Sequence, residues 1–203
     1  MTTLHRHLAA WACNNAWANH RLLGACAKLT QAEFVAARTS FFPSLKSTLN
    51  HNLTVDWYYV DAIERCLAGR PPNAEAAKFW DPEEPFDNCA DLWREQRKVD
   101  RRLVDACESM TEADMDRMVG VPRRAGVLEE PMHRLLAHLF EHAIHHRGQV
   151  HAMLAGTTVK PPQLDEFFCA NEAPLREAEL RDLGFTEAQI WKQSKRGQST
   201  LGK

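Results

Sequence analysis

The chain has 203 residues, of which 26% are charged and 44% hydrophobic, the mixture typical of a globular protein. Its formal net charge is −2, which argues against a nucleic-acid-binding protein that relies on phosphate neutralisation. No apolar run reaches the roughly 18–20 residues of a membrane span, and the N-terminus lacks an apolar signal core. We therefore expect one domain over residues 1–193, in the cytoplasm, with neither nucleic acid nor membrane as a partner.

Two long helices are predicted in the first third of the chain. Apolar residues recur at steps of three and four over residues 3–28, where Asn15 interrupts the stripe and is interpreted as a hydrogen-bonding core residue. A capping-box spacing at Thr30 and Glu33 predicts a short helical turn. The second long helix is expected over residues 44–68, ended by the sequence Gly-Arg-Pro-Pro.

A third long helix follows a proline-rich loop, predicted over residues 71–86. Asp87 or Asn88 can cap this helix, which extends to about Ser109 and carries a run of charges interpreted as a solvated face. Residues 119–130 contain two glycines and a proline and are expected to form a loop or a short hairpin.

A fourth long helix and two short ones complete the prediction. The fourth begins with Pro131 in its first turn and is expected to end at Gly156, in a left-handed conformation. An extended stretch, two short helices over residues 174–183 and 186–193, and a mobile tail over residues 194–203 follow. Strand signals are nearly absent, so we predict an all-α fold, a four-helix bundle with short additional C-terminal helices.

Six cysteines are scattered along the chain without a Cys-x-x-Cys pair. This pattern favours reduced thiols that are buried as small hydrophobes, as in a cytosolic protein. A zinc ribbon or a redox dithiol is not indicated.

The fourth helix contains six of the ten histidines. His142 and His146 lie one turn apart, so their rings share a face, and His138 lies one turn earlier on the same stripe. His138 and His146 are about 12 Å apart along the axis, too far for one ion with bonds of about 2.0–2.1 Å. An adjacent pair plus a ligand from elsewhere is expected, and the spacing does not choose between the two pairs. His51, in the middle of the second helix, is a candidate for the further ligand.

A short motif offers another interpretation of this helix. Residues 138–142 match the His-x-x-Glu-His pattern of inverted zinc proteases, with Glu141 as the base. Five positions are a weak signal, and such a protease requires an α/β scaffold that a chain nearly free of strands does not offer.

A longer pattern resembles the DinB family of metal-dependent bundle proteins. Its most specific segment is His-His-Arg-Gly-Gln at residues 145–149, within residues 138–150 (HLFEHAIHHRGQV). Weaker segments occur in the same order, namely NAWANHRLL at residues 15–23, STLNHNLTVDW at residues 47–57 and PPQLD at residues 161–165. The resemblance covers about residues 5–168.

The resemblance implies a metal site formed by one histidine of the second helix and two of the fourth. Matched residue by residue, these are His51, His142 and His146, and His138 and His145 become supporting residues of the pocket. Relatives often have an amide residue at the position of Glu141, so this carboxylate is a departure from the pattern.

Three neutral imidazoles leave a coordination position open, which is typical of a catalytic site. They suit a divalent ion, Zn²⁺ or Ni²⁺ first, with Fe²⁺ or Cu²⁺ also accepted. The resembled superfamily includes enzymes that use low-molecular-weight thiols. We therefore expect a thiol S-transferase acting on a small-molecule substrate, in a chain that can form a homodimer. A metal-dependent hydrolase and a non-catalytic metal-binding stress-response module are the alternatives.

Overall fold

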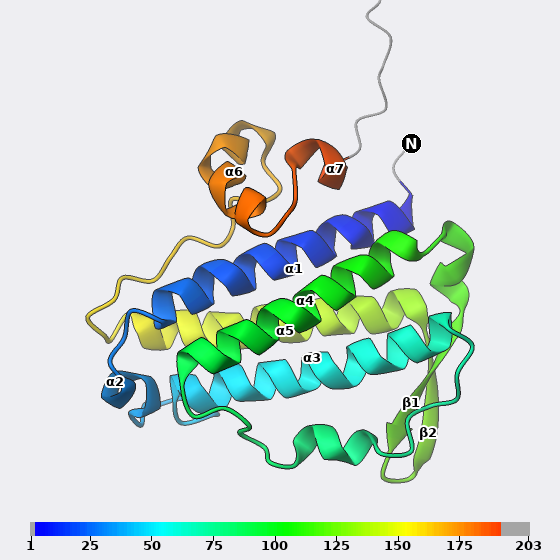
Figure 1. The fold of residues 1–203 in the computed structure, drawn as a ribbon, viewed down its shortest axis with the longest axis horizontal. Helices are drawn as coiled ribbons and strands as arrows, with labels where there is room; N and C mark the ends of the chain where they lie inside the picture. Colours follow the sequence, from blue (N-terminus) through cyan, green and yellow to red (C-terminus); the bar gives the residue numbers. More distant parts are fainter. Residues whose placement is uncertain (1–2, 192–203) are drawn as a thin grey trace, which may run out of the picture.

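The structure is a computed structural model that describes residues 3–191. Four long helices lie side by side in it: α1 (Leu4–Cys26), α3 (Leu45–Leu67), α4 (Cys89–Ser109) and α5 (Met132–Leu154) (Figure 1). Helices α1 and α3 each pack against both α4 and α5, so the four surround one hydrophobic core. The predicted all-α class is confirmed, apart from a small hairpin. The predicted tail over residues 194–203 lies outside the described residues.

Local capping accounts for several of the helix boundaries. The Ser44 hydroxyl accepts a hydrogen bond from the Ser47 amide at 3.0 Å and starts α3, and Asn88 rather than Asp87 caps α4 through the Asp91 amide at 2.9 Å. After α3, Gly69 adopts a φ of 64°, the left-handed conformation in which glycine commonly follows a helix. Gly156 does not adopt the left-handed conformation, because α5 ends with Ala155 still in the right-handed region. The prediction of a left-handed Gly156 was therefore wrong.

Short elements connect the long helices. Helix α2 (Gln31–Val35) carries the predicted capping box. The predicted loop contains a 3-10 helix, η1 (Ala76–Trp80), and a second one, η2 (Glu112–Asp116), precedes an antiparallel hairpin of β1 (Met118–Arg123) and β2 (Gly126–Pro131). Towards the C-terminus, η3 (Ala170–Glu172), α6 (Ala173–Asp182) and α7 (Glu187–Trp191) follow, and α6 and α7 rest on the outer side of α1 (Figure 1).

The cysteines are free, and four of them are buried as predicted. Cys66 is half-buried, and Cys169 is exposed because it lies in the segment that leads into η3. The expectation of buried thiols was therefore wrong for Cys169.

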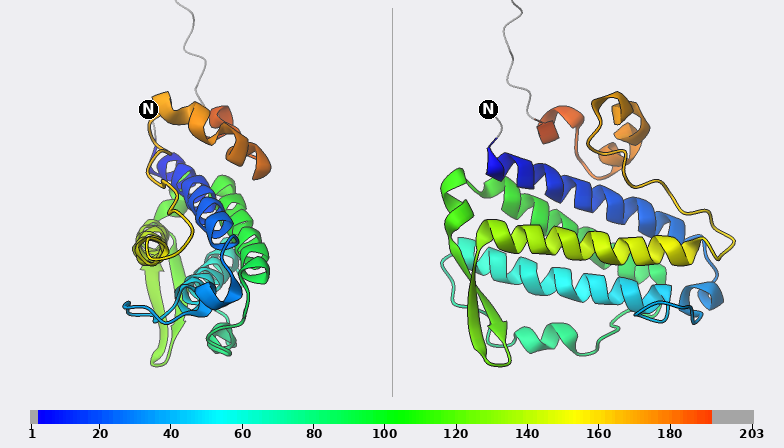
Figure 2. Two further views of the ribbon diagram at one scale, coloured as in Figure 1. Left: turned by 90° about the vertical axis from the view of Figure 1, so that its left-hand side faces the viewer. Right: turned by 180° about the vertical axis from the view of Figure 1, so that it is seen from behind.

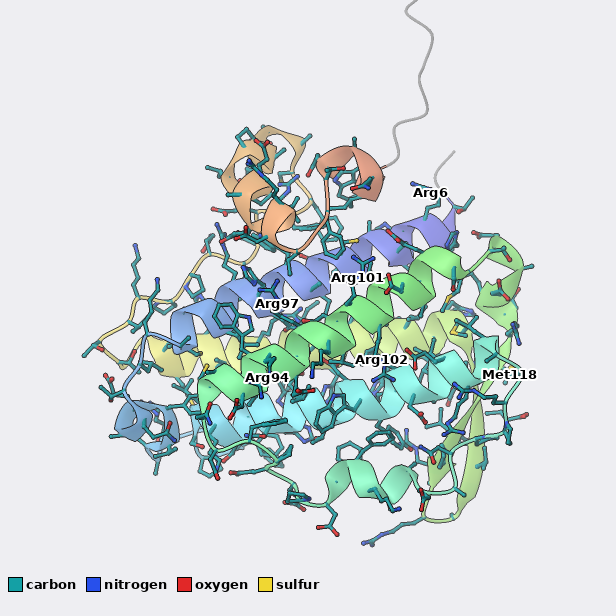
Figure 3. The ribbon with its side chains drawn as sticks, viewed as in Figure 1. Arg6, Arg94, Arg97, Arg101, Arg102 and Met118 are labelled. Carbon is teal, nitrogen blue, oxygen red and sulfur yellow. The ribbon has the colours of Figure 1, made fainter. Side chains whose placement is uncertain are left out.

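The charged run of α4 is only partly a solvated face. Figure 3 shows Arg94, Arg97, Arg101 and Arg102 along the outer side of this helix. Gln96 and Asp100, however, are only 2% and 4% exposed and point inward. The interpretation of the charged run as a solvated face was therefore wrong at Asp100, and the uncharged Gln96 one turn earlier is buried beside it.

Gln96 and Asp100 belong to a buried group of polar residues, here called the core polar cluster (Asn15, Asn19, Asp56, Gln96, Asp100 and Arg147). The Arg147 Nη1 donates to the side-chain oxygens of Asn15 and Asn19, the latter at 2.9 Å, and the Asn19 amide donates to Asp100 at 2.9 Å. The Gln96 amide donates to Asp56 at 2.7 Å and to Asp100 at 3.1 Å. One hydrogen-bonded network thus joins all four long helices.

Burial raises the pKa of Asp56 to about 7 and that of Asp100 to about 8, and the neighbouring Asp56 adds to the shift of Asp100. The hydrogen bonds and the Arg147 charge act in the opposite direction. At least one of the two carboxyl groups therefore holds its proton well above the usual range of an aspartate.

Asp100→Asn is expected to make the stability of the fold less sensitive to alkaline pH. An unfolded aspartate loses its proton near pH 3.9, whereas folded Asp100 keeps it to about pH 8. Between these values the unfolded chain binds fewer protons, so stability falls as pH rises, by at most about 1.4 kcal/mol per pH unit for one group. Denaturant unfolding at mildly acidic and mildly alkaline pH measures this loss. The exposed Asp105→Asn serves as the control, and an equal loss in wild type and Asp100→Asn would contradict the prediction.

Candidate metal centre

Helices α3 and α5 bring three histidines together. His51 comes from the middle of α3, and His142 and His146 come from successive turns of α5. One ring nitrogen of each lies within 4.8 Å of the other two, and the His51 and His142 Nε2 atoms are 3.2 Å apart. Seen from behind, α5 lies between α1 and α3 (Figure 2). The rings of His142 and His146 lie 5.2 Å and 4.8 Å from the His51 ring of α3. Of the two pairs that the spacing allowed, the structure thus places His142 and His146 beside His51.

The geometry and chemistry of this group fit a divalent metal ion. Two nitrogens bound to one tetrahedral ion at about 2.0–2.1 Å lie roughly 3.3–3.4 Å apart, close to the separation of the His51 and His142 Nε2 atoms. The buried His142 Nδ1 has no hydrogen-bond partner among the described residues. The His146 Nδ1 is 2.9 Å from the Gln149 Oε1, so a proton on this nitrogen is donated to the amide oxygen and the Nε2 lone pair stays free.

The three imidazoles are uncharged at neutral pH. Burial lowers the pKa of His142 to about 3 and that of His51 to about 4, and it also lowers the pKa of His146. The neighbouring imidazoles shift these pKa values in the same direction. Neutral imidazole is the form that binds metal, so the folded site remains competent well below pH 6.5, where a free imidazole takes up a proton.

Two aromatic residues that the sequence analysis did not single out border the site. The Phe42 ring stacks on His51 at 4.3 Å between ring centroids and lies 5.5 Å from His146. The Trp80 ring, from η1, is 6.4 Å from His51. Both lie in segments without helical periodicity, and an aromatic pair inside a proline-rich loop is the one signal that could have indicated Trp80.

The other histidines of this face lie beside the group. The His138 ring is 6.3 Å from His142 and 5.4 Å from Tyr59, and it is exposed. His145 is also exposed, and its Nε2 accepts a hydrogen bond from the Gln149 amide nitrogen at 3.0 Å. Glu141 is exposed and does not join the three-histidine group. Among residues 3–191, no fourth histidine, cysteine or carboxylate completes it.

The model of the DinB family matches residues 2–179, so the chain belongs to the DinB family. The matched region includes all three histidines and ends within α6. No curated protein matches the chain. Between residues 3 and 191, no helix is both long and apolar enough to cross a membrane.

Alanine substitutions are expected to divide the residues of this face into two groups. His51→Ala, His142→Ala or His146→Ala should abolish stoichiometric zinc binding, because each removes one of three converging donors. His138→Ala, His145→Ala and Gln149→Ala should only weaken it, by about 10–100-fold, the usual cost of losing a supporting residue. Isothermal titration with zinc measures both effects. If His138→Ala empties the site and His146→Ala does not, the choice of ligands is wrong.

Metal binding is expected to stabilise the fold over a wide range of pH. At a hundredfold excess over the dissociation constant, an ion bound only by the folded chain adds about 2.7 kcal/mol to the free energy of unfolding. Because burial lowers the pKa values of all three histidines, to about 4 for His51 and about 3 for His142, protons compete for the folded site at lower pH than they do for free imidazole. The rise in melting temperature should therefore persist at pH 5.5 and fade towards pH 4.

His51→Ala provides the control for this measurement. The variant should show no comparable rise at any of these pH values, since two ligands on one helix hold a divalent ion weakly. A full rise in His51→Ala at neutral pH, or a complete loss of the wild-type rise already at pH 5.5, would contradict the prediction.

Proposed function

We propose that the chain is a metal-dependent enzyme that transfers the sulfur of a low-molecular-weight thiol to a small electrophilic substrate. His51, His142 and His146 would hold the ion, Zn²⁺ or Ni²⁺ first. The observation that carries the proposal is the convergence of three neutral imidazole donors, one from α3 and two from α5, within 4.8 Å of one another. Helices α1 and α3 each pack against both α4 and α5, and this arrangement supports a four-helix bundle as the framework.

The donor set favours an anionic fourth ligand. Three uncharged imidazoles leave the charge of a divalent ion uncompensated and at least one coordination position open. A bound ion would lower the pKa of a thiol there and so supply thiolate at neutral pH. The membership of the DinB family supports this chemistry, because the superfamily includes thiol-dependent enzymes.

The chain's own residues would orient the reactants. Gln149 holds the His146 Nδ1 at 2.9 Å and thereby fixes the ring that offers its Nε2. Phe42 and Trp80 provide apolar surface next to His51, which favours an electrophile with an apolar body. In the transfer a carbon–sulfur bond forms, the bond from that carbon to its leaving group breaks, and the thiol proton passes to solvent. No oxidant or reductant is required.

Zinc-loaded protein is expected to accelerate the reaction of a small thiol with 1-chloro-2,4-dinitrobenzene. The thioether product is followed by its absorbance, with cysteine, glutathione and coenzyme A as the thiols tested. We expect a saturable rate that falls by at least about tenfold, the effect of roughly 1.4 kcal/mol on a barrier, after metal removal or in His142→Ala. His133→Ala is the matched control, because His133 lies on the same helix but bonds to the Met115 carbonyl.

Two outcomes would contradict the proposal. Thiol-independent hydrolysis of activated esters by the zinc-loaded protein would indicate the metal-dependent hydrolase instead. Absence of both reactions in protein that binds zinc stoichiometrically would indicate a non-catalytic metal-binding module.

A further inference from the structure

A cavity lies on the side of α5 that faces away from the three histidines. It has a volume of about 490 Å³ and is bounded by α1, α5 and the segment that follows Gln163. At about 100° per residue, Ile144, Arg147 and Gly148 point roughly 100–160° away from His142 and His146 around the helix. The cavity and the candidate metal centre are therefore separate. The lining residues used below are Trp11, Ile144, Arg147, Gly148, Asp165 and Phe168.

The guanidinium of Arg147 is the cation of this cavity. Arg147 is only 4% exposed, and burial lowers its pKa to about 10, so it remains charged at neutral pH. Its Nη1 donates to Asn15 and Asn19, but among the described residues neither Nε nor Nη2 has a hydrogen-bond partner. No described carboxylate lies within ion-pair distance of it, and Asp56 and Asp100 act on its charge only from a longer distance. Neither nitrogen is among the fully enclosed polar atoms that lack a partner, so both donors remain open to an anion, which a largely buried cation favours.

Gly148 keeps the cavity open. Glycine within a helix costs roughly 0.5–1 kcal/mol relative to alanine, yet a Cβ added at Gly148 would meet no atom within 4 Å. Neither close packing nor a left-handed backbone therefore requires glycine at this position. The missing side chain leaves free space beside Arg147 along the cavity wall.

The rest of the wall is largely apolar. Ile144 and Phe168 are 45% and 39% exposed, unusually high for residues of their type, and both line the cavity. The Trp11 and Phe168 rings lie 4.9 Å apart and form an aromatic wall. Asp165 lines the cavity at an exposed position, where its charge disfavours a ligand with several negative charges.

We infer that this cavity binds a small organic monocarboxylate with an aromatic or aliphatic body, whose carboxylate pairs with the free guanidinium donors of Arg147. The apolar body would cover Trp11, Ile144 and Phe168. The site is independent of the proposed thiol transfer, because it lies on another face of α5 and needs no metal.

The test compares 4-phenylbutyrate with 4-phenylbutanamide, which has the same apolar body without the charge. Isothermal titration of the full chain, after treatment with a chelator, measures both. We expect the carboxylate to bind at least about tenfold more tightly, because a charge-assisted bidentate pair is roughly twice as strong as a neutral hydrogen bond. Addition of zinc should leave its dissociation constant unchanged.

Gly148→Leu places a large side chain at the cavity wall, where an added Cβ meets no atom within 4 Å. The variant should lose phenylbutyrate affinity by at least about tenfold while its melting temperature is not lowered, since leucine is the better helix former. Ala152→Leu, at an exposed position of the same helix that does not line the cavity, should bind as wild type does.

The inference would be overturned by equal affinities for the carboxylate and the amide, or by no binding at millimolar concentration. It would also be overturned by unchanged affinity in Gly148→Leu. Binding that requires zinc would place the carboxylate on the metal ion instead.

Discussion

The placement of α5 depends on the buried hydrogen bonds of Arg147. Asn15 and Asn19 of α1 hold its guanidinium, and because His146 is the preceding residue, its ring points about 100° away, towards α3. A slide of α5 by one turn would carry His142 and His146 about 5.4 Å past His51 and remove the guanidinium from its acceptors. Leaving a charge buried without partners costs several kcal/mol. The core polar cluster thus sets the register on which the three-histidine group depends.

The core polar cluster and the three-histidine group both contact α5, but they differ in whether an added ion is needed to satisfy their polar atoms. The core polar cluster contains the Arg147 cation, two carboxyl groups whose pKa values are raised by burial, and amides that hydrogen-bond to both, so it supplies most of its own donors and acceptors. The three histidines have no acidic neighbour within their group, and burial keeps them uncharged. The His51 and His142 Nε2 atoms can share only one proton between them across 3.2 Å, and a bound cation would engage all three converging nitrogens at once. Metal binding at this group would therefore be coupled to the packing of α3 against α5.

The long helices could be predicted because their apolar periodicity continues for more than twenty residues and their caps, such as Ser44 and Asn88, act locally. The contact of His51 with His142 and His146 could not be deduced from residue spacing, because it depends on how far α3 is shifted along its axis relative to α5. The family resemblance predicted it. Asp100 lies in a charged run, and its tertiary contact with Asn19 of α1 distinguishes it from the solvated residues around it. Phe42 reaches the site through an irregular segment whose path no local pattern encodes.

The central claim is that His51, His142 and His146 together bind one metal ion. X-ray absorption spectroscopy of the chain loaded with one equivalent of zinc tests it most directly. The account predicts three imidazole nitrogens at about 2.0–2.1 Å and one further light ligand from solvent, with the imidazole contribution reduced in His51→Ala. A shell containing sulfur at about 2.3 Å, or an imidazole contribution that His51→Ala leaves unchanged, would contradict it.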